Sequence, residues 1–131
     1  TSLPAFAAET RLSTSVESGV VLDDLNLALR PHGLMVGPDP ASSNRATLGG
    51  MVANNSTGTH SILYGNVERH IESVEFILAD GSTASFGPQT EHDWTASLSA
   101  PGFEGEVRRG LDAIIRNRGA VIARDTPGHW R

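Results

Sequence analysis

The chain has 131 residues, long enough for one domain with its own core and too short for two domains of ordinary size. Fifteen acidic against ten basic residues give a net charge of −5, which argues against nucleic-acid binding, where lysine and arginine cluster. Without cysteine, disulfides and thiolate metal sites are excluded. Apolar runs stay short of the ~18 residues of a membrane span, and no signal-peptide pattern opens the sequence. We therefore expect a globular protein in the cytoplasm, or peripheral to the membrane.

The N-terminal third of the chain predicts two short strands around one helix. Residues 1–12 show no period and are expected to form a loose lead-in. Residues 12–16 alternate apolar and polar side chains, which is typical of a strand. Apolar residues recur at helical spacing over 21–29, and a proline and a glycine follow as stop signals. Residues 34–36 are expected to form a brief buried strand.

The second half predicts a hairpin, a helix and a last strand. Residues 71–78 are largely apolar and lead to Asp80-Gly81, a pair typical of hairpin turns, so 82–86 should return as the partner strand. Residues 102–119 carry apolar side chains on one helical face and end at a glycine. The apolar tetrad 120–123 is expected to be a strand. Because no βαβ alternation occurs, the sequence predicts an α+β fold, with a mixed or antiparallel sheet flanked by helices.

Side chains suited to acid–base, nucleophilic or metal chemistry form no recognisable arrangement. The five histidines are widely spaced, so a metal site would need the fold to gather them. The serines lack an identifiable base, and Asp23 and Asp24 are neighbours that do not face each other on a helix. Phosphate-loop, nucleophile-elbow and dinucleotide-binding motifs are absent. We therefore assign no catalytic residue and no metal ligand.

Residues 37–58, GPDPASSNRATLGGMVANNSTG, combine features that point to a ligand. Thr47 is expected to cap a short helix that starts at Leu48 and whose first amide hydrogens meet an anion or a carbonyl oxygen. Gly49 and Gly50 remove the Cβ atoms that would keep a flat ring or a pyrophosphate at a distance. The alternative is a glycine-softened helical turn that packs on the core. The residues alone leave both interpretations open.

The order of residues in this stretch and after it is similar to that of a known family. P-D-P, then A-T-L-G-G-M-x-A-x-N-x-x-G, Y-G and L-A-D-G-S resemble the FAD-binding domain of FAD-linked oxidases. This is the vanillyl-alcohol oxidase, or PCMH-type, superfamily, and the D-lactate dehydrogenase and glycolate oxidase branch is the most similar. The resemblance runs from about Ser13 to Val121. It implies that residues 13–131 are a partial FAD-binding domain, the second of the family's two α+β subdomains.

The resemblance implies FAD as the cofactor. In the intact enzyme it implies oxidation of a small 2-hydroxy acid, such as lactate, glycolate or 2-hydroxyglutarate, by hydride transfer to flavin N5. Carried over position by position, it places these residues beside FAD: Pro38, Asp39, Thr47, Gly49, Gly50, Asn54, Gly58, Tyr64, Gly65 and Ile122. None of them needs to be an acid, a base or a nucleophile, because the flavin supplies the redox chemistry.

The chain also departs from the family. The glycine-rich pyrophosphate loop of the first subdomain does not occur before Ser13, and the substrate domain is missing. The resemblance therefore implies a piece of a larger enzyme that does not retain FAD by itself and whose exposed apolar area promotes self-association. Two alternatives stay open: a binding or assembly module that lost the cofactor, and part of an NADPH-dependent reductase that resembles enolpyruvyl-glucosamine reductase.

Overall fold

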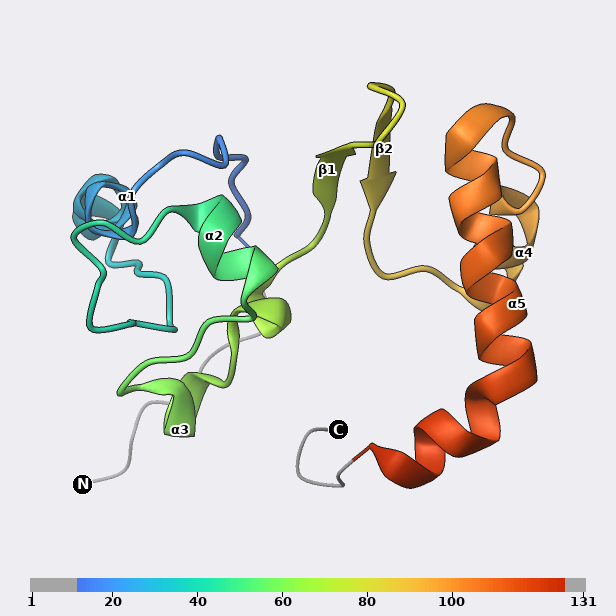
Figure 1. The fold of residues 1–131 in the computed structure, drawn as a ribbon. Coiled ribbons are helices and arrows are strands. Elements are labelled where there is room, and N and C mark those ends of the chain that lie inside the picture. The colour runs from blue at the N-terminus through green and yellow to red at the C-terminus, as the bar shows by residue number, and fades with distance from the viewer. Residues whose placement is uncertain (1–11, 127–131) are drawn as a thin grey trace. The chain divides into compact units, whose positions relative to one another are not determined.

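The computed structural model describes residues 12–126 and divides the chain into two compact units, one ending at Glu72 and one beginning at Ser73. Figure 1 shows the helices and strands of both units. The first unit contains helices α1 (Leu22–Leu29), α2 (Leu48–Ala53) and α3 (Ser61–Tyr64), with 3₁₀ helices at Arg30–His32 and Val67–His70. The second unit contains strands β1 (Val74–Ile77) and β2 (Thr83–Phe86) and helices α4 (Glu91–Ser97) and α5 (Gly102–Asp125). Helices with a small antiparallel sheet confirm the predicted α+β class.

The core of the first unit lies between α1, α2 and the second 3₁₀ helix. Its buried members are Leu22, Leu48, Met51 and Val67, and Val20, Leu25, Val36, Ala46, Val52 and Ile71 pack against them. Leu22 is fully buried, and its backbone amide donates to the carbonyl oxygen of Ala46 at 2.9 Å. This contact ties the start of α1 to the segment that leads into α2.

Helix α1 forms where the sequence predicts it, but the two flanking strands do not. Gly33 ends the helical region with a φ of 69°, a left-handed conformation that glycine adopts without strain. The amide of Val36 donates to the side-chain oxygen of Asn26 at 2.8 Å, so residues 34–36 are held by a side chain and not by a strand. Residues 12–16 are exposed and form no ladder with any described residue. Both strand predictions were wrong because an apolar pattern does not supply a partner strand.

The predicted hairpin is confirmed. Strands β1 and β2 pair antiparallel, with Val74 opposite Phe86 and Ile77 opposite Thr83. The turn places Gly81 at a φ of 85°, and the Asp80 carboxylate accepts hydrogen bonds from the amide and hydroxyl of Ser82. An Asp-Gly pair after an apolar run is therefore a sufficient local signal for this turn.

The helices of the second unit differ from the sequence prediction. Helix α4 was missed, although Thr90 begins it and accepts a hydrogen bond from the amide of Asp93 at 3.1 Å, a pattern typical of a helix start. Helix α5 continues through Gly119 to Asp125, so the predicted glycine stop and the predicted strand over 120–123 are both wrong. A single interior glycine costs a helix only about 1 kcal/mol relative to alanine, too little to end it.

Arg108 of α5 lies at the centre of the second unit and is only 4% exposed. Its guanidinium donates to Glu104 at 2.7 Å and to the backbone oxygen of Ser85 at 3.0 Å, and it lies 4.6 Å from the ring centroid of Phe86. The Phe86 ring meets the Phe76 ring edge-on. A buried cation with satisfied hydrogen bonds thus joins the hairpin to α5.

Candidate cofactor-facing site

The start of α2 is built by hydrogen bonds within the first unit. Thr47 precedes the helix, and its hydroxyl oxygen accepts from the amide of Gly50 at 3.4 Å, which confirms the predicted cap. The amides of Leu48 and Gly49 donate to carbonyl oxygens of segment 18–20 at 2.9 and 2.8 Å. Of the two acceptors expected from the sequence, an anion and a carbonyl oxygen, the structure shows the carbonyl oxygen.

The two adjacent glycines of α2 have different surroundings. A Cβ on Gly49 would lie 2.8 Å from the Cβ of Ser18 and 3.1 Å from its carbonyl oxygen, so the fold itself requires a glycine there. A Cβ on Gly50 would meet only the hydroxyl oxygen of Thr47, at 3.2 Å. Gly50 is exposed, although its amide donates to Thr47 and its carbonyl oxygen accepts from the amide of Asn54. Only Gly50 therefore offers open backbone to a group from outside the chain.

The exposed side of α2 carries small residues and one amide. Leu48 and Met51 point into the core, whereas Gly50, Ala53 and Asn54 are exposed. Positions spaced by three and four residues share one face of a helix, so these last three form a single low surface. No described residue hydrogen-bonds the Asn54 side chain, which leaves its donor and acceptor for a ligand or for water. We call Gly50, Ala53 and Asn54 the α2 face.

The carboxylate of Asp39 is hydrogen-bonded within the chain and is not free for a ligand. Its carboxylate accepts a hydrogen bond from the backbone amide of His60 at 2.8 Å and lies 2.5 Å from the ring Nδ1 of the same residue. The backbone hydrogen bond from His60 lowers the pKa of Asp39 below its ordinary value. Pro38 is fully buried, and a Cβ on Gly58 would lie 2.2 Å from the Asp39 carbonyl carbon. Segments 37–39 and 58–60 therefore cross in close contact, and we call this crossing the Asp39–His60 clasp.

Tyr64 and Gly65 belong to the same assembly. A Cβ on Gly37 would lie 2.7 Å from the Cβ of Tyr64, so the tyrosine packs directly on that glycine. The backbone oxygen of Tyr64 lies 3.0 Å from Nε2 of His70, and 39% of the tyrosine is exposed. Gly65 has a φ of 79°, which places it at the tight exit of α3. Both residues shape the chain beside the Asp39–His60 clasp.

The structure thus gathers most of the predicted cofactor positions in the first unit. Ile122 is the exception: it lies on α5 in the second unit, and its placement beside a cofactor stays a prediction. Two contacts were missed, the role of His60 and a pair in which Asn55 donates to Glu68 at 2.7 Å. Asn55 has a positive φ, which asparagine tolerates better than most residues. Nothing in the sequence, however, identifies Glu68 as its partner, because the two residues are 13 positions apart.

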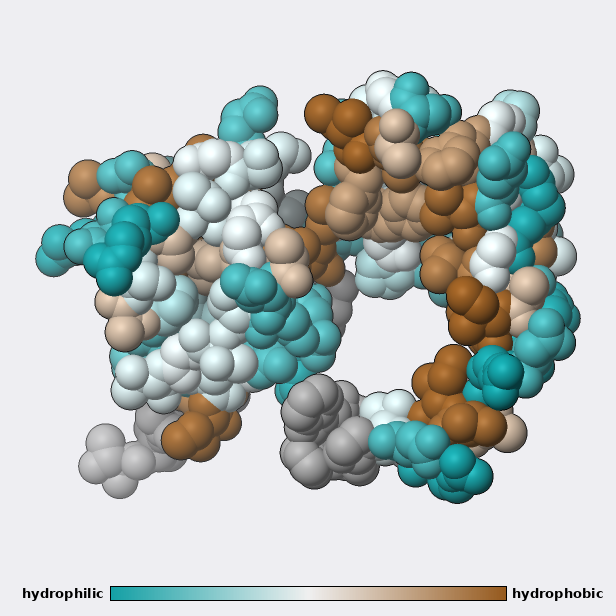
Figure 2. Space-filling view, in the orientation of Figure 1, coloured by the Kyte–Doolittle hydropathy of each residue, from teal (hydrophilic) through white to brown (hydrophobic). Residues whose placement is uncertain are grey.

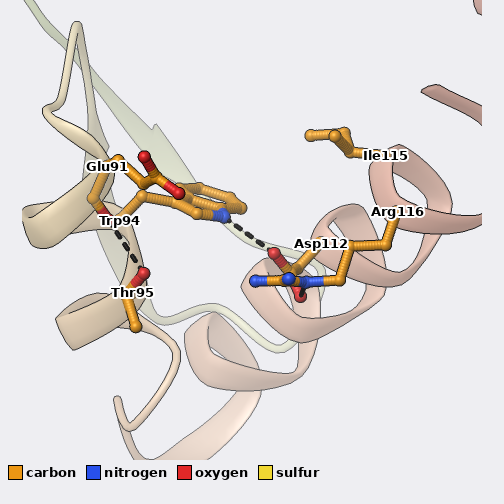
Figure 3. Close-up of a pocket in the computed structure, with 6 residues that line it drawn as sticks. All are labelled: Glu91, Trp94, Thr95, Asp112, Ile115 and Arg116. Carbon is orange, nitrogen blue, oxygen red and sulfur yellow. Dashed lines mark hydrogen bonds and ion pairs between the residues drawn. The ribbon is translucent and has the colours of Figure 1, made fainter. Parts of the chain in front are cut away.

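Other kinds of site find no support in the described part of the chain. Residues 12–126 contain no cluster of three histidine or acidic side chains placed to hold a metal ion. Within the same range, no helix has the length and apolar character to cross a membrane. A pocket of about 350 Å³ lies between α4 and α5 (Figure 3), and none of the predicted cofactor positions lines it.

Comparison with known proteins adds three relatives. The model of a family described as FAD binding domain matches residues 7–87. D-2-hydroxyglutarate dehydrogenase of Pseudomonas putida is 35% identical over 112 residues, and that of Haemophilus influenzae is 44% identical over 115; each match covers 86% of this chain and 11% of the relative. Glycolate oxidase subunit GlcD of Bacillus subtilis is 32% identical, covering 82% of this chain and 24% of the relative. No solved structure matches. The chain thus spans a small part of the length of these relatives.

Proposed function

Because the chain belongs to the FAD-binding domain family of FAD-linked oxidoreductases, we propose that it holds FAD against the α2 face as one part of a larger enzyme. The missing parts of that enzyme are the first FAD subdomain and the substrate domain. The lengths of the relatives support this proposal, since this chain covers only 11% of each D-2-hydroxyglutarate dehydrogenase. The complete enzyme acts in the cytoplasm or at the membrane periphery.

The open backbone of Gly50 is the observation that carries the proposal. Gly49 is explained by the packing of Ser18, whereas among the described residues a Cβ on Gly50 would meet only the hydroxyl oxygen of Thr47, at 3.2 Å. A flat ring approaches a helix closely only where Cβ atoms are absent or small, and Ala53 continues the same low surface. Asn54 adds a hydrogen-bonding group at the end of this face. These residues fit a planar cofactor with polar edges.

The residues around the α2 face have positioning roles. Thr47 fixes the first turn of α2, and the Asp39–His60 clasp holds together the two ends of the segment that contains this helix. The carboxylate of Asp39 is already used by His60, so we assign it to orienting the segment and not to direct contact with the cofactor. Tyr64 packs on Gly37 at the same crossing, and Gly65 follows it at the exit of α3.

The reaction that we propose for the complete enzyme is oxidation of a small 2-hydroxy acid. FAD supplies a flavin N5 that accepts a hydride from the substrate carbon. We assign no acid or base for this step to the described residues, and the part that we propose for them is to bind, orient and exclude water. The names of the relatives, two D-2-hydroxyglutarate dehydrogenases and a glycolate oxidase subunit, favour this reaction over that of a cell-wall reductase.

The proposal is tested by titrating FAD while flavin fluorescence is followed, with riboflavin and ADP as controls. Both the 131-residue chain and the complete polypeptide that contains it are used. We expect saturable binding by the complete polypeptide and weak or no binding by the chain alone. A complete polypeptide that binds no flavin would contradict the proposal and favour a binding or assembly module that has lost its cofactor.

Gly50→Val sharpens the same titration. We expect it to abolish flavin binding while the helical circular dichroism signal is kept, because the valine fills the approach to the α2 face. Ala28→Val, at an exposed position of α1, is the matched control and should leave flavin binding unchanged. Equal loss of helical signal and of flavin binding in Gly50→Val would show that Gly50 is a packing residue.

A further inference from the structure

One side of α5 carries an apolar stripe that no described residue of the second unit buries. Leu111, Ile114, Ile115, Val121 and Ile122 recur at spacings of three, four and seven residues, which places them on one face of the helix. Each is between 40% and 55% exposed. Figure 2 shows the corresponding brown surface along α5. We call these five residues the α5 stripe.

Helix α5 buries little of its surface beyond its first turns in the described part of the second unit. Its buried residues are Gly105 and Arg108, and no residue from Arg109 to Asp125 is buried. Gly110 and Gly119 lie inside the helix, and a Cβ on either would meet nothing within 4 Å. Each interior glycine costs about 1 kcal/mol relative to alanine. Helices in water depend mostly on packing of an apolar face, so this helix needs a surface for its stripe.

The stripe borders the pocket between α4 and α5, because Ile115 belongs to both. Figure 3 shows the Trp94 indole and Ile115 on opposite sides of this pocket. The polar groups between them are already paired: Trp94 Nε1 donates to Asp112 at 3.1 Å, and Arg116 Nε donates to the other oxygen of Asp112 at 2.6 Å. The Glu91 carboxylate and Thr95 also line the pocket, so its apolar side chains are those of Trp94 and Ile115.

The positive charge of Arg118 lies within the apolar stripe and favours a partner that carries a carboxylate. Arg118 is exposed and lies three or four residues from Ile114, Ile115, Val121 and Ile122, so it is on the same face. No described residue pairs with its guanidinium. A second copy of the chain, docked on this stripe, would bring two Arg118 side chains to the same contact, where like charges repel. A partner with a carboxylate opposite Arg118 avoids that cost.

The relatives indicate where such a partner is found. The family model ends at residue 87, before α4 and α5. The match to the Pseudomonas putida dehydrogenase covers 112 of the 131 residues. Wherever that match begins, it includes residues 20–112, and therefore α4 and the start of α5. The sequence that forms α4 and the first turns of α5 is thus shared with a protein of which this chain covers only 11%, while most of the α5 stripe follows residue 112.

We propose that the α5 stripe and the adjoining pocket dock onto another part of the same longer polypeptide. That part presents apolar side chains to the stripe, inserts one of them between Trp94 and Ile115, and places a carboxylate opposite Arg118. The inference rests on the larger-enzyme part of the proposed function and is independent of flavin binding. A failed FAD titration and a failed docking test are therefore distinguishable.

Hydrogen exchange followed by mass spectrometry tests the docking. Amides of residues 111–122 are compared between the complete polypeptide and the 131-residue chain. We expect exchange in this segment to be at least about 100-fold slower in the complete polypeptide, because docking removes local opening of the helix. Equal rates in the two proteins would overturn the proposal.

Matched variants of the complete polypeptide locate the contact. Ile115→Arg should return the segment to fast exchange, whereas Ala120→Arg adds the same side chain at an exposed position outside the stripe and should leave the protection intact. Arg118→Glu should reduce protection and Arg118→Lys should keep most of it. Equal effects of Ile115→Arg and Ala120→Arg, or no effect of Arg118→Glu, would contradict the docking as stated. Sedimentation of the 131-residue chain tests whether a second copy of the chain binds the stripe instead. If the chain dimerised and Ile115→Arg abolished the dimer, a second copy would be the occupant and the proposed docking within one polypeptide would be overturned.

Discussion

In the first unit the side chains of Leu22, Leu48, Met51 and Val67 are almost fully buried, whereas in the second unit the most buried large side chain is that of the charged Arg108. The first unit keeps its apolar residues inside, and its candidate site is a low polar face on the outside. The second unit joins a hairpin to a helix through one guanidinium and exposes the apolar face of that helix. Burial of apolar area is the main stabilising term in folding. We infer that the first unit is stabilised by its own core and that the second depends more on contacts beyond its own residues.

The largest effect is expected in the core of the first unit. Leu22→Ala removes a fully buried side chain and leaves a cavity, which typically costs about 2–5 kcal/mol of unfolding free energy. Urea denaturation followed by circular dichroism measures the loss. Leu27→Ala, on the exposed side of the same helix, is the control and should change stability by less than about 0.5 kcal/mol. Similar losses for both variants would contradict the buried position of Leu22.

The corresponding test of the second unit removes its buried charge. Arg108→Ala leaves the Ser85 oxygen and the Glu104 carboxylate without their donor and should cost about 3 kcal/mol. Arg116→Ala breaks a pair of the same helical spacing, with Asp112, but this arginine side chain is 66% exposed and the expected loss is below about 1 kcal/mol. Denaturation followed by Trp94 fluorescence reports on this unit. If the two variants lost equal stability, the guanidinium would not be the link between hairpin and helix.

The two glycines of α2 separate packing from cofactor approach. Gly49→Ala pushes a Cβ against Ser18 and should cost about 1–3 kcal/mol, as overpacked positions do. Gly50→Ala meets only the Thr47 hydroxyl and should change stability by less than about 1 kcal/mol, since alanine also favours the helix. Thermal unfolding of the two variants measures the difference. A larger loss of stability for Gly50→Ala than for Gly49→Ala would contradict the inference that Gly50 is open to a ligand.

A smaller effect is expected from the threonine caps, of which each unit has one. Thr47→Ala and Thr90→Ala each remove a hydroxyl that accepts an amide hydrogen bond at a helix start and should cost about 1 kcal/mol. The Thr90 contact is the shorter, 3.1 against 3.4 Å, so its loss should be the greater. Replacement of either residue by serine keeps the acceptor and should restore most of the stability. Full loss in the serine variants would show that the threonine methyl group, and not the cap, is what matters.

The smallest effect concerns acid stability of the Asp39–His60 clasp. The amide hydrogen bond from His60 depresses the pKa of Asp39 in the folded chain. Its contribution is therefore present above the ordinary value of 3.8 and is lost as the pH falls through the lower, folded value. Asp39→Asn should be less stable than the wild type at pH 6, and the difference should shrink towards pH 3. A difference that stays constant over this range would show that the charge of Asp39 contributes nothing.

Local signals in the sequence predicted the elements that depend on local chemistry. The helical spacing of α1, the Thr47 cap, the Asp-Gly hairpin turn and the start of α5 all formed as expected. The strand predictions over 12–16, 34–36 and 120–123 were wrong, because a strand needs a partner and apolar patterning does not name one. Helix α4 was missed although its Thr90 cap was visible in the sequence.

The sequence was enough to predict which residues belong to the candidate site, but not which of them contact one another in the fold. The order of Pro38, Asp39, Thr47 and the two glycines was enough to indicate the FAD-binding family, which the comparison with known families shows. The contact between Asp39 and His60 joins residues that are 21 positions apart, and only folding brings them together. The same holds for Ser18, whose packing makes Gly49 structural and leaves Gly50 as the open position.

The sequence by itself determined the fold class, the family and the local starts and turns, because these follow from short-range hydrogen bonding, periodicity and residue order. The tertiary structure alone decided that Asp39 is used by His60, that Arg108 is buried between hairpin and helix, and that the α5 stripe is left exposed. Such outcomes depend on which distant segments meet, and the free energy of those contacts is not encoded in any short stretch of the chain.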